Sequence, residues 1–176
     1  MFEEVKEAYG VADQDVVRSK YNNLVLYLIE KGITISSMES CTGGQIASLL
    51  TDTEGSSAVF KGALVTYRND VKIKSGVPQS VIEQYGVYSA QTAEAMAEAC
   101  KRNFDSDASI GVTGSFGNVD PNNIDSVPGE VYFAISSPLG TKSYKCTIPT
   151  QESRFSYKLY IADMIADRLK AILQMK

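Results

Sequence analysis

The chain has 176 residues, 44% of them hydrophobic, and this length fits a single domain that buries its own core. Its 17 basic and 21 acidic residues are mixed along the sequence, which argues against nucleic acid as a partner. Because the chain contains no histidine, Ser-His-Asp triads, Cys-His pairs and histidine-bearing metal sites are excluded. Any serine or cysteine nucleophile must use Lys, Tyr, Asp or Glu as its base.

The apolar pattern predicts alternating helices and strands, followed by a hairpin. Residues 1–14 form an amino-terminal extension that could hold a short helix. Expected helices cover 15–32, 42–50, 70–75 and 78–85, a segment that starts at Ser89, and a carboxy-terminal segment that includes 161–172. Expected strands cover 33–38, 59–67, 108–113, 130–136 and 141–148.

This order of elements predicts one domain, residues 1–176, of the α/β class: a three-layer α/β/α sandwich with a mixed, mostly parallel sheet. The one long irregular segment, residues 114–128, is rich in Gly, Asn, Asp and Pro. Loops of this length are usually functional or mobile.

The cysteines and the amino terminus indicate a reducing environment. Cys41, Cys100 and Cys146 are scattered and form no CxxC pair, so neither a disulfide framework nor a zinc site is expected. No signal-peptide pattern or membrane-spanning apolar run is present. We expect a cytoplasmic protein with no membrane partner.

The stretch MESCTGG, residues 38–44, lies between an expected strand and an expected helix. Backbone N–H groups at such a turn attract anions or a developing oxyanion, and open α/β sheets bind ligands at this edge. Ser40 is therefore a candidate nucleophile. On context alone, Ser40 or Thr42 could equally be a simple helix cap, which stabilises a helix by roughly 1 kcal/mol.

Two further stretches carry candidate chemistry. In VTYRNDVK, residues 65–72, Tyr67 and Lys72 could face the same mouth of the sheet. A lysine base requires its pKa to fall from about 10.4 to about 7–8, and a solvated surface lysine is the alternative. In GVTGSFG, residues 111–117, Thr113 and Ser115 offer hydroxyls suited to phosphate oxygens, although a plain strand-ending turn has the same pattern.

Taken together, these stretches resemble one known family. ESCTGG, GSSAVFKGALVTYRNDVK, GVYSAQTAEAMAE, GVTG and PGEVYFAI occur in this order over residues 22–168. The sequence is similar to the nicotinamide mononucleotide deamidase family, the carboxy-terminal domain of CinA-type competence/damage-inducible proteins. The resemblance implies a stand-alone form without the preceding molybdopterin-binding-like domain, acting in pyridine nucleotide salvage as a homo-oligomer.

The resemblance also implies an activity and a site. The reaction would be hydrolysis of nicotinamide mononucleotide to nicotinate mononucleotide and ammonia, with no metal or cofactor. Ser40 would be the nucleophile, and Lys72 with Tyr67 would activate it and shuttle protons, a variant of triad logic. Residues implied in substrate or oxyanion binding are Cys41, Thr42, Gly43, Gly44, Asn69, Thr113, Gly114, Ser115 and Arg154. Cys41 is expected to matter through its backbone N–H and not its sulfur.

The chain departs from the family pattern after GVTG. Family members usually continue with a glycine-rich run and a Lys-Pro-Val-Gly turn, whereas residues 115–129 here are SFGNVDPNNIDSVPG. Asp120 and Asp125 thus enter where an anionic ligand would lie. We expect weakened binding of the mononucleotide or preference for a less anionic amide. A non-catalytic nucleotide- or partner-binding homologue and an amidase for another small amide are the alternatives.

A second departure lies near Arg154. The usual Gly-Asp-Arg is Glu152-Ser153-Arg154 here, and the next basic residue is Lys158. Arginine can bind a phosphate through two parallel hydrogen bonds, but taken alone Arg154 could equally be a surface charge.

Overall fold

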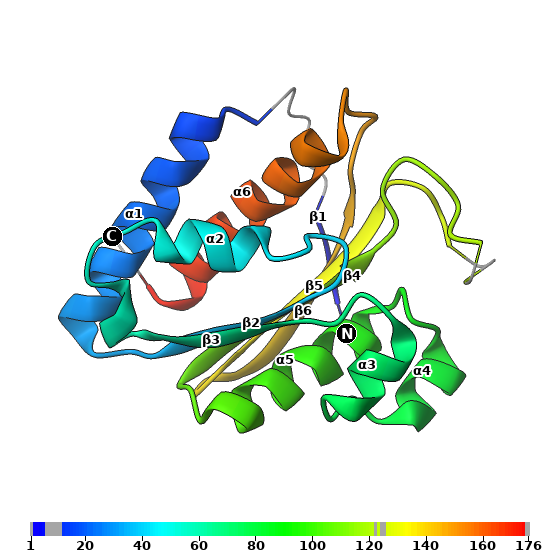
Figure 1. Cartoon of the computed structure of the whole chain (residues 1–176), viewed down its shortest axis with the longest axis horizontal. Coiled ribbons are helices and arrows are strands. Elements are labelled where there is room, and N and C mark those ends of the chain that lie inside the picture. Colours follow the sequence, from blue (N-terminus) through cyan, green and yellow to red (C-terminus); the bar gives the residue numbers. More distant parts are fainter. Residues whose placement is uncertain (1, 6–11, 122, 124–125, 175–176) are drawn as a thin grey trace.

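The fold is built on a six-stranded sheet with the strand order β1-β6-β5-β4-β2-β3 (Figure 1). A computed structural model describes residues 2–5, 12–121, 123 and 126–174. The strands are β1 (Glu3–Val5), β2 (Ile35–Glu39), β3 (Phe60–Val65), β4 (Ala108–Gly114), β5 (Glu130–Ser137) and β6 (Gly140–Thr147). The helices are α1 (Gln14–Lys31), α2 (Gln45–Thr51), the 3-10 turn η1 (Ser56–Ala58), α3 (Asn69–Lys74), α4 (Gln79–Tyr85), α5 (Ala90–Phe104) and α6 (Arg154–Ile172).

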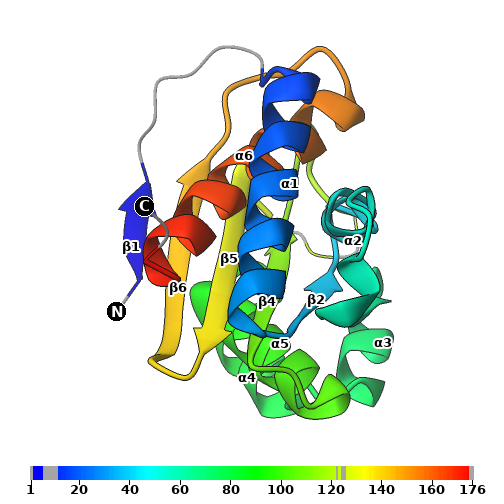
Figure 2. The same cartoon turned by 90° about the vertical axis from the view of Figure 1, so that its left-hand side faces the viewer.

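The helices cover both faces of the sheet. Helices α1, α2 and α6 lie on one face and α3, α4 and α5 on the other, as the two views show (Figures 1 and 2). The expected three-layer α/β/α sandwich is therefore confirmed. In the part of the chain that the structure describes, no helix is both long and apolar enough to cross a membrane.

Local sequence signals fix where the long helices begin and end. The Asp13 carboxylate accepts hydrogen bonds from the N–H groups of Asp15 and Val16 at 2.9 and 3.0 Å and so caps α1. Gly32, with φ 64°, ends that helix in the left-handed region. The Ser89 hydroxyl caps α5 by accepting from the Thr92 N–H at 3.1 Å. These signals explain why the expected bounds lie close to the observed ones.

The sheet is mixed, and its parallel half positions the site. β2 pairs in parallel with both β3 and β4, whereas β4, β5 and β6 pair antiparallel. The carboxyl ends of β2, β3 and β4 therefore meet at one edge of the sheet. The loops that follow these strands carry the three stretches singled out in the sequence.

The amino-terminal extension differs from the short helix that its sequence allowed. Residues 3–5 form β1, which pairs in parallel with β6, with Glu3 opposite Tyr144. Val5 is buried, whereas Glu3 and Glu4 face solvent. A backbone ladder along the edge of β6 pairs groups that would otherwise be open, and this tertiary pairing cannot be predicted from a three-residue pattern. Residues 6–11 lie outside the described residues.

Gly111 lets α5 pack directly on β4. A Cβ at this position would overlap the carbonyl oxygen of Ala93 and lie 2.5 Å from the backbone nitrogen of Ala97. Only a residue without a side chain therefore allows the present separation of helix and strand.

Gly111→Ala is expected to lower the free energy of unfolding by about 1–3 kcal/mol, because the added methyl group forces the helix away from the sheet. Urea denaturation measures the change. Gly117→Ala is the matched control, since its Cβ would lie 3.4 Å from its nearest neighbour, the Tyr157 hydroxyl. Equal stability of the two variants would contradict the packing argument.

Candidate active site

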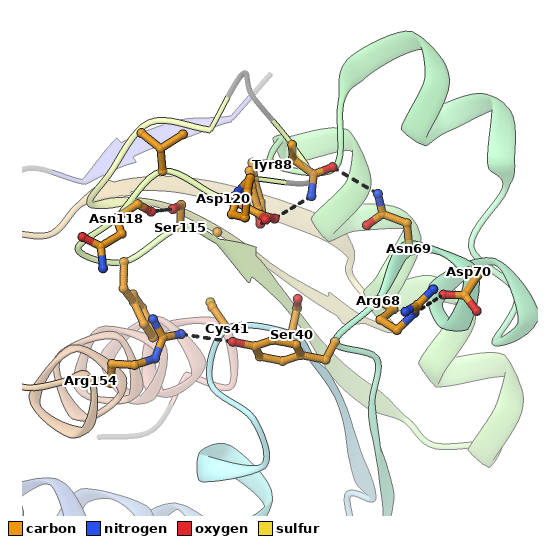
Figure 3. Close-up of a pocket in the computed structure, with 16 residues that line it drawn as sticks. Ser40, Cys41, Arg68, Asn69, Asp70, Tyr88, Ser115, Asn118, Asp120 and Arg154 are labelled. Atoms are coloured by element: carbon orange, nitrogen blue, oxygen red, sulfur yellow. Dashed lines mark hydrogen bonds and ion pairs between the residues drawn. The ribbon is translucent and has the colours of Figure 1, made fainter.

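The loops after β2, β3 and β4 enclose a pocket of about 580 Å³ (Figure 3). Its lining combines the turn after β2, the segment between β3 and α3, Tyr88, the loop after β4 and the start of α6. The lining residues are Ser40, Cys41, Tyr67, Arg68, Asn69, Asp70, Tyr88, Gly114, Ser115, Phe116, Asn118, Val119, Asp120, Pro121, Asn123 and Arg154. The volume lies in the range of small-molecule sites.

Ser40 lines this pocket and is hydrogen-bonded to Lys72, which is buried and does not line the pocket itself. The Lys72 Nζ lies 3.1 Å from the Ser40 Oγ and donates a second hydrogen bond to the Thr66 carbonyl oxygen at 2.8 Å. Lys72 is only 1% exposed. Sequence spacing suggested that both residues face one mouth of the sheet, and the structure brings them into direct contact.

Burial makes Lys72 a much weaker base than a surface lysine. Desolvation lowers the pKa of its ammonium group to about 8, while the nearby Cys41 thiol and Asp120 carboxylate act in the opposite direction. A substantial fraction of the side chain is therefore neutral near physiological pH. The neutral amine can accept the Ser40 hydroxyl proton across the 3.1 Å contact.

The Glu39 side chain fills the amino terminus of α2. Its carboxylate accepts hydrogen bonds from the N–H groups of Gly44, Ile46 and Ala47 at 3.0, 3.1 and 2.8 Å, and from the Ser37 hydroxyl at 3.1 Å. Glu39 is 0% exposed. A protein carboxylate thus holds the position at which the sequence suggested an anionic ligand.

The sequence suggested that the N–H groups of this turn are free to bind an anion. The structure shows that the N–H groups of Gly43 and Gly44 are already used. Gly44 donates to Glu39 at 3.0 Å, and Gly43 donates to the Ser40 carbonyl oxygen at 3.1 Å. Among the described residues, only the Cys41 and Thr42 N–H groups of this turn donate to no oxygen atom. The glycines have a different role, because φ values of 58° for Gly43 and 96° for Gly44 let the chain enter α2.

The Cys41 sulfur is not poised for nucleophilic attack. Cys41 is buried, and desolvation raises the pKa of its thiol to about 12 despite the opposing effect of Lys72. The thiolate, which is the reactive form of cysteine, is therefore scarce at neutral pH. Geometry and protonation both favour the neighbouring Ser40 as the nucleophile.

Tyr67 lines the pocket but forms no hydrogen bond with Ser40 or Lys72. Its side chain is 61% exposed, and its hydroxyl accepts a hydrogen bond from the Arg154 Nη2 at 3.1 Å. Thr66, one residue earlier, points inward and is 1% exposed. Tyr67 is thus directed toward Arg154 on α6, and the expected proton-shuttling contact is absent from this structure.

Arg154 approaches the pocket from the first turn of α6. Its guanidinium carbon lies 5.4 Å from the centre of the Phe116 ring, and Phe116 stacks on Tyr157. Among the described residues, no carboxylate forms an ion pair with it. The guanidinium can therefore bind an anionic part of a ligand.

The remaining predicted binding residues divide into two groups. Asn69, Gly114 and Ser115 line the pocket. Thr113 does not, because its buried hydroxyl donates to the Val87 carbonyl oxygen at 3.0 Å and ties β4 to the segment before α5. Thr42 is also fully buried behind the turn. Thr113, which the family resemblance implied in substrate binding, therefore does not line the pocket.

The loop after β4 supplies residues that the sequence interpretation did not assign. The Asp120 carboxylate accepts hydrogen bonds from the Tyr88 hydroxyl and the Asn123 Nδ2, both at 2.6 Å. Asn69 donates to the Asn123 Oδ1 at 3.1 Å (Figure 3). Tyr88 lies within the GVYSAQ stretch that carried the family resemblance, and that stretch was its only signal. Asp125 lies outside the described residues.

The positions of the acidic and cysteine side chains also show whether the described residues could bind a metal ion. Within the described ranges, no group of three or more His, Cys, Asp or Glu side chains is placed to hold a metal ion.

Glu39→Gln is expected to lower the free energy of unfolding by about 2–4 kcal/mol, because the amide NH₂ would face backbone donors that the carboxylate now satisfies. Chemical denaturation provides the measurement. Glu30→Gln serves as the control, since Glu30 is exposed and pairs with Lys31 at 2.7 Å. A Glu39→Gln protein as stable as this control would show that the cap contributes little.

Comparisons with known proteins agree with this architecture. The sequence model of the CinA C-terminal domain matches residues 18–165. A CinA-like protein of Flavobacterium psychrophilum is 42% identical over 121 residues, which are 67% of this chain and 28% of that protein. A CinA-like protein of Shewanella denitrificans is 37% identical over 147 residues, which are 83% of this chain and 34% of that protein. The chain thus spans only a part of these relatives.

Solved structures show the same fold. The crystal structure of a competence/damage inducible protein from Agrobacterium tumefaciens superposes with a TM-score of 0.82 at 26% identity, covering 94% of this chain and 99% of that chain. A CinA superfamily protein from Escherichia coli superposes with a TM-score of 0.77 at 25% identity. Because the family match covers residues 18–165, most of the sequence, the chain belongs to the CinA C-terminal domain family.

Proposed function

We propose that this domain hydrolyses a carboxamide, with nicotinamide mononucleotide as the substrate that the family resemblance favours. The products would be nicotinate mononucleotide and ammonia. The observation that carries the proposal is the 3.1 Å contact between the Ser40 Oγ and the buried Lys72 Nζ. A serine paired with a desolvated lysine is an established way to activate a hydroxyl nucleophile without histidine.

In the acylation step, neutral Lys72 takes the proton of the Ser40 hydroxyl as the Oγ attacks the carboxamide carbon. The carbonyl π electrons move to oxygen and give a tetrahedral oxyanion. When this intermediate collapses, the C–N bond breaks and the Lys72 ammonium gives its proton to the leaving nitrogen. Ammonia departs, and the acyl group remains bonded to Ser40.

The Cys41 and Thr42 N–H groups are the donors available to the oxyanion. Glu39 and the Ser40 carbonyl occupy the other N–H groups of the glycine turn. The N–H of the residue after a nucleophile on a strand-to-helix turn is a common oxyanion donor. One well-placed donor contributes roughly 3–4 kcal/mol to transition-state stabilisation.

In the deacylation step, water attacks the acyl carbon while Lys72 again serves as the base. Collapse of the second tetrahedral intermediate breaks the bond to the Ser40 Oγ, which regains its proton from Lys72. The carboxylic acid product then ionises and leaves. Lys72 returns to its neutral state, so no cofactor is consumed.

The far side of the pocket suits the nucleotide portion of the substrate. Arg154 is held by the Tyr67 hydroxyl at 3.1 Å and by the Phe116 ring, and has no carboxylate partner among the described residues. Its guanidinium would bind the phosphate. We accordingly assign Tyr67 to substrate binding beside Arg154 and leave proton transfer to Lys72.

Substitutions at the neighbouring residues Ser40 and Cys41 show which of the two is the nucleophile. Ser40→Ala is expected to lower kcat at least about 1,000-fold because the acyl-enzyme cannot form, whereas Cys41→Ser keeps most of the activity because the backbone N–H remains. Ammonia release from nicotinamide mononucleotide measures both. If Cys41→Ser lost its activity and Ser40→Ala kept it, the nucleophile would be Cys41 and the assignment of Ser40 would be wrong.

The pH profile tests Lys72. Because the active form is the neutral amine, kcat/KM is expected to rise about tenfold per pH unit below the pKa and to level off near pH 8. Lys72→Met removes the base and should cost about 100- to 10,000-fold. Lys74→Met is the control, since the Lys74 side chain is 79% exposed on the same helix. A flat profile from pH 6 to 9 would contradict the assignment.

The same assays separate the alternative functions. Turnover of another small amide, with the mononucleotide inactive, would indicate an amidase of different specificity. Tight binding of the mononucleotide without ammonia release from any amide in a panel would indicate a non-catalytic homologue.

A further inference from the structure

The altered loop brings a carboxylate into the wall of the pocket. Asp120 lies across the pocket from Ser40 and Cys41 (Figure 3). It belongs to the segment in which the usual glycine-rich run is replaced. It is the only charged residue among the described residues from 115 to 123.

Hydrogen bonds from neutral groups hold this carboxylate in place. The Tyr88 hydroxyl and the Asn123 amide donate to the Asp120 Oδ2 at 2.6 Å each. Asn69, at the start of α3, fixes Asn123 in turn at 3.1 Å. Three separate segments thus position the side chain, which is typical of a built feature of a site and not of a freely moving surface group.

The charges of the pocket are separated in space. The Asp120 carboxylate acts on the Lys72 ammonium electrostatically and raises its pKa, so its negative charge is felt at the reacting end. The cation without a carboxylate partner, Arg154, approaches from α6 beside Phe116. A ligand that matches this layout has a positive group near the reacting carbonyl and a negative group farther away.

We propose that Asp120 makes the pocket selective for carboxamides attached to a positively charged ring. This inference rests on the proposed function and specifies its substrate class. In an oxidised nicotinamide nucleotide the carboxamide is attached to a pyridinium ring, and the phosphate lies at the other end of the molecule. With the carboxamide carbon at Ser40, the ring charge lies within a few ångströms, on the side of the catalytic pair.

The charge of Lys72 makes this pairing effective. When Lys72 is neutral and acts as a base, its electrostatic attraction to the Asp120 carboxylate is lost. A pyridinium ring in the pocket brings a positive charge that the carboxylate attracts. Attraction between the carboxylate and the ring thus operates in the protonation state that reacts.

This placement differs from the expectation that Asp120 repels the substrate phosphate. The two hypotheses predict different responses to removal of the carboxylate. If Asp120 faces the ring, its loss weakens only ligands with a charged ring. If it faces the phosphate, its loss strengthens every phosphate-bearing ligand, whatever the charge of its ring.

The experiment measures the dissociation constants of nicotinamide mononucleotide and its reduced form, whose dihydropyridine ring is neutral. Calorimetry on Ser40→Ala protein avoids turnover, and Asp120→Asn is introduced into the same background. Asparagine keeps an oxygen that can accept from Tyr88 and Asn123, and thermal melting verifies folding. Asp52→Asn is the matched control, because Asp52 does not line the pocket and its carboxylate pairs with Arg18 at 3.5 Å.

We expect the oxidised form to bind about tenfold more tightly than the reduced form, with most of this preference lost in Asp120→Asn and kept in Asp52→Asn. A preference that Asp120→Asn leaves unchanged would overturn the proposal. Equal tightening of both ligands would also overturn it and would place Asp120 beside the phosphate.

A second pair of ligands separates this proposal from the proposed function. 1-Methylnicotinamide and nicotinamide differ in ring charge and lack both ribose and phosphate. If the mononucleotides do not bind, an Asp120-dependent preference for 1-methylnicotinamide would support charge selection while the nucleotide assignment fails. Absence of binding by both pairs would overturn both proposals.

Discussion

The geometry of the site depends on one buried carboxylate at the end of β2. Glu39 holds the N–H groups of Gly44, Ile46 and Ala47 within 3.1 Å, so α2 is fastened to the strand that precedes it. Charged hydrogen bonds of this kind are about twice as strong as neutral ones. The cap fixes the path of the intervening turn, and Ser40 therefore faces the pocket. It also occupies the helix terminus that an anion could otherwise use, and under the proposed mechanism the Cys41 and Thr42 N–H groups remain for the oxyanion.

The second constraint is the burial of Lys72, which opposes stability and lowers the pKa of its ammonium group, as the proposed role of a base requires. Lys72 is 1% exposed, so its amine loses most of its hydration. This desolvation raises the free energy of the charged form more than that of the neutral form. The Thr66 carbonyl at 2.8 Å satisfies one donor and orients the side chain toward Ser40. Because α3 is short and follows β3 directly, the lysine reaches across the sheet edge to the turn after β2. The parallel pairing of β2 with β3 is what makes this reach short.

Sequence patterns predicted the architecture well because the long helices and strands carry strong periodicity and explicit caps. They also predicted Ser40 and Lys72, which follow neighbouring parallel strands. They failed where orientation is decided by tertiary contacts: Tyr67 turns toward Arg154, and the Thr113 hydroxyl is used by the Val87 carbonyl. The role of Glu39 was missed because a glutamate at the end of a strand carries no signal until α2 is placed against it. The strand at residues 3–5 depends in the same way on the edge of β6.

The loop after β4 is held together by its own side chains, beside the Ser40–Lys72 pair. Glycine-rich loops bind anions through exposed backbone N–H groups, but here side-chain hydroxyls satisfy the loop internally. The Ser115 hydroxyl donates to the Asn118 carbonyl, and the Asp120 N–H donates to the Ser126 hydroxyl, both at 2.7 Å. The charged group that this loop contributes to the pocket is a carboxylate, Asp120, beside the neutral side chains of Ser115, Asn118 and Asn123. The cation Arg154 comes instead from α6, so the two charges reach the pocket from different elements.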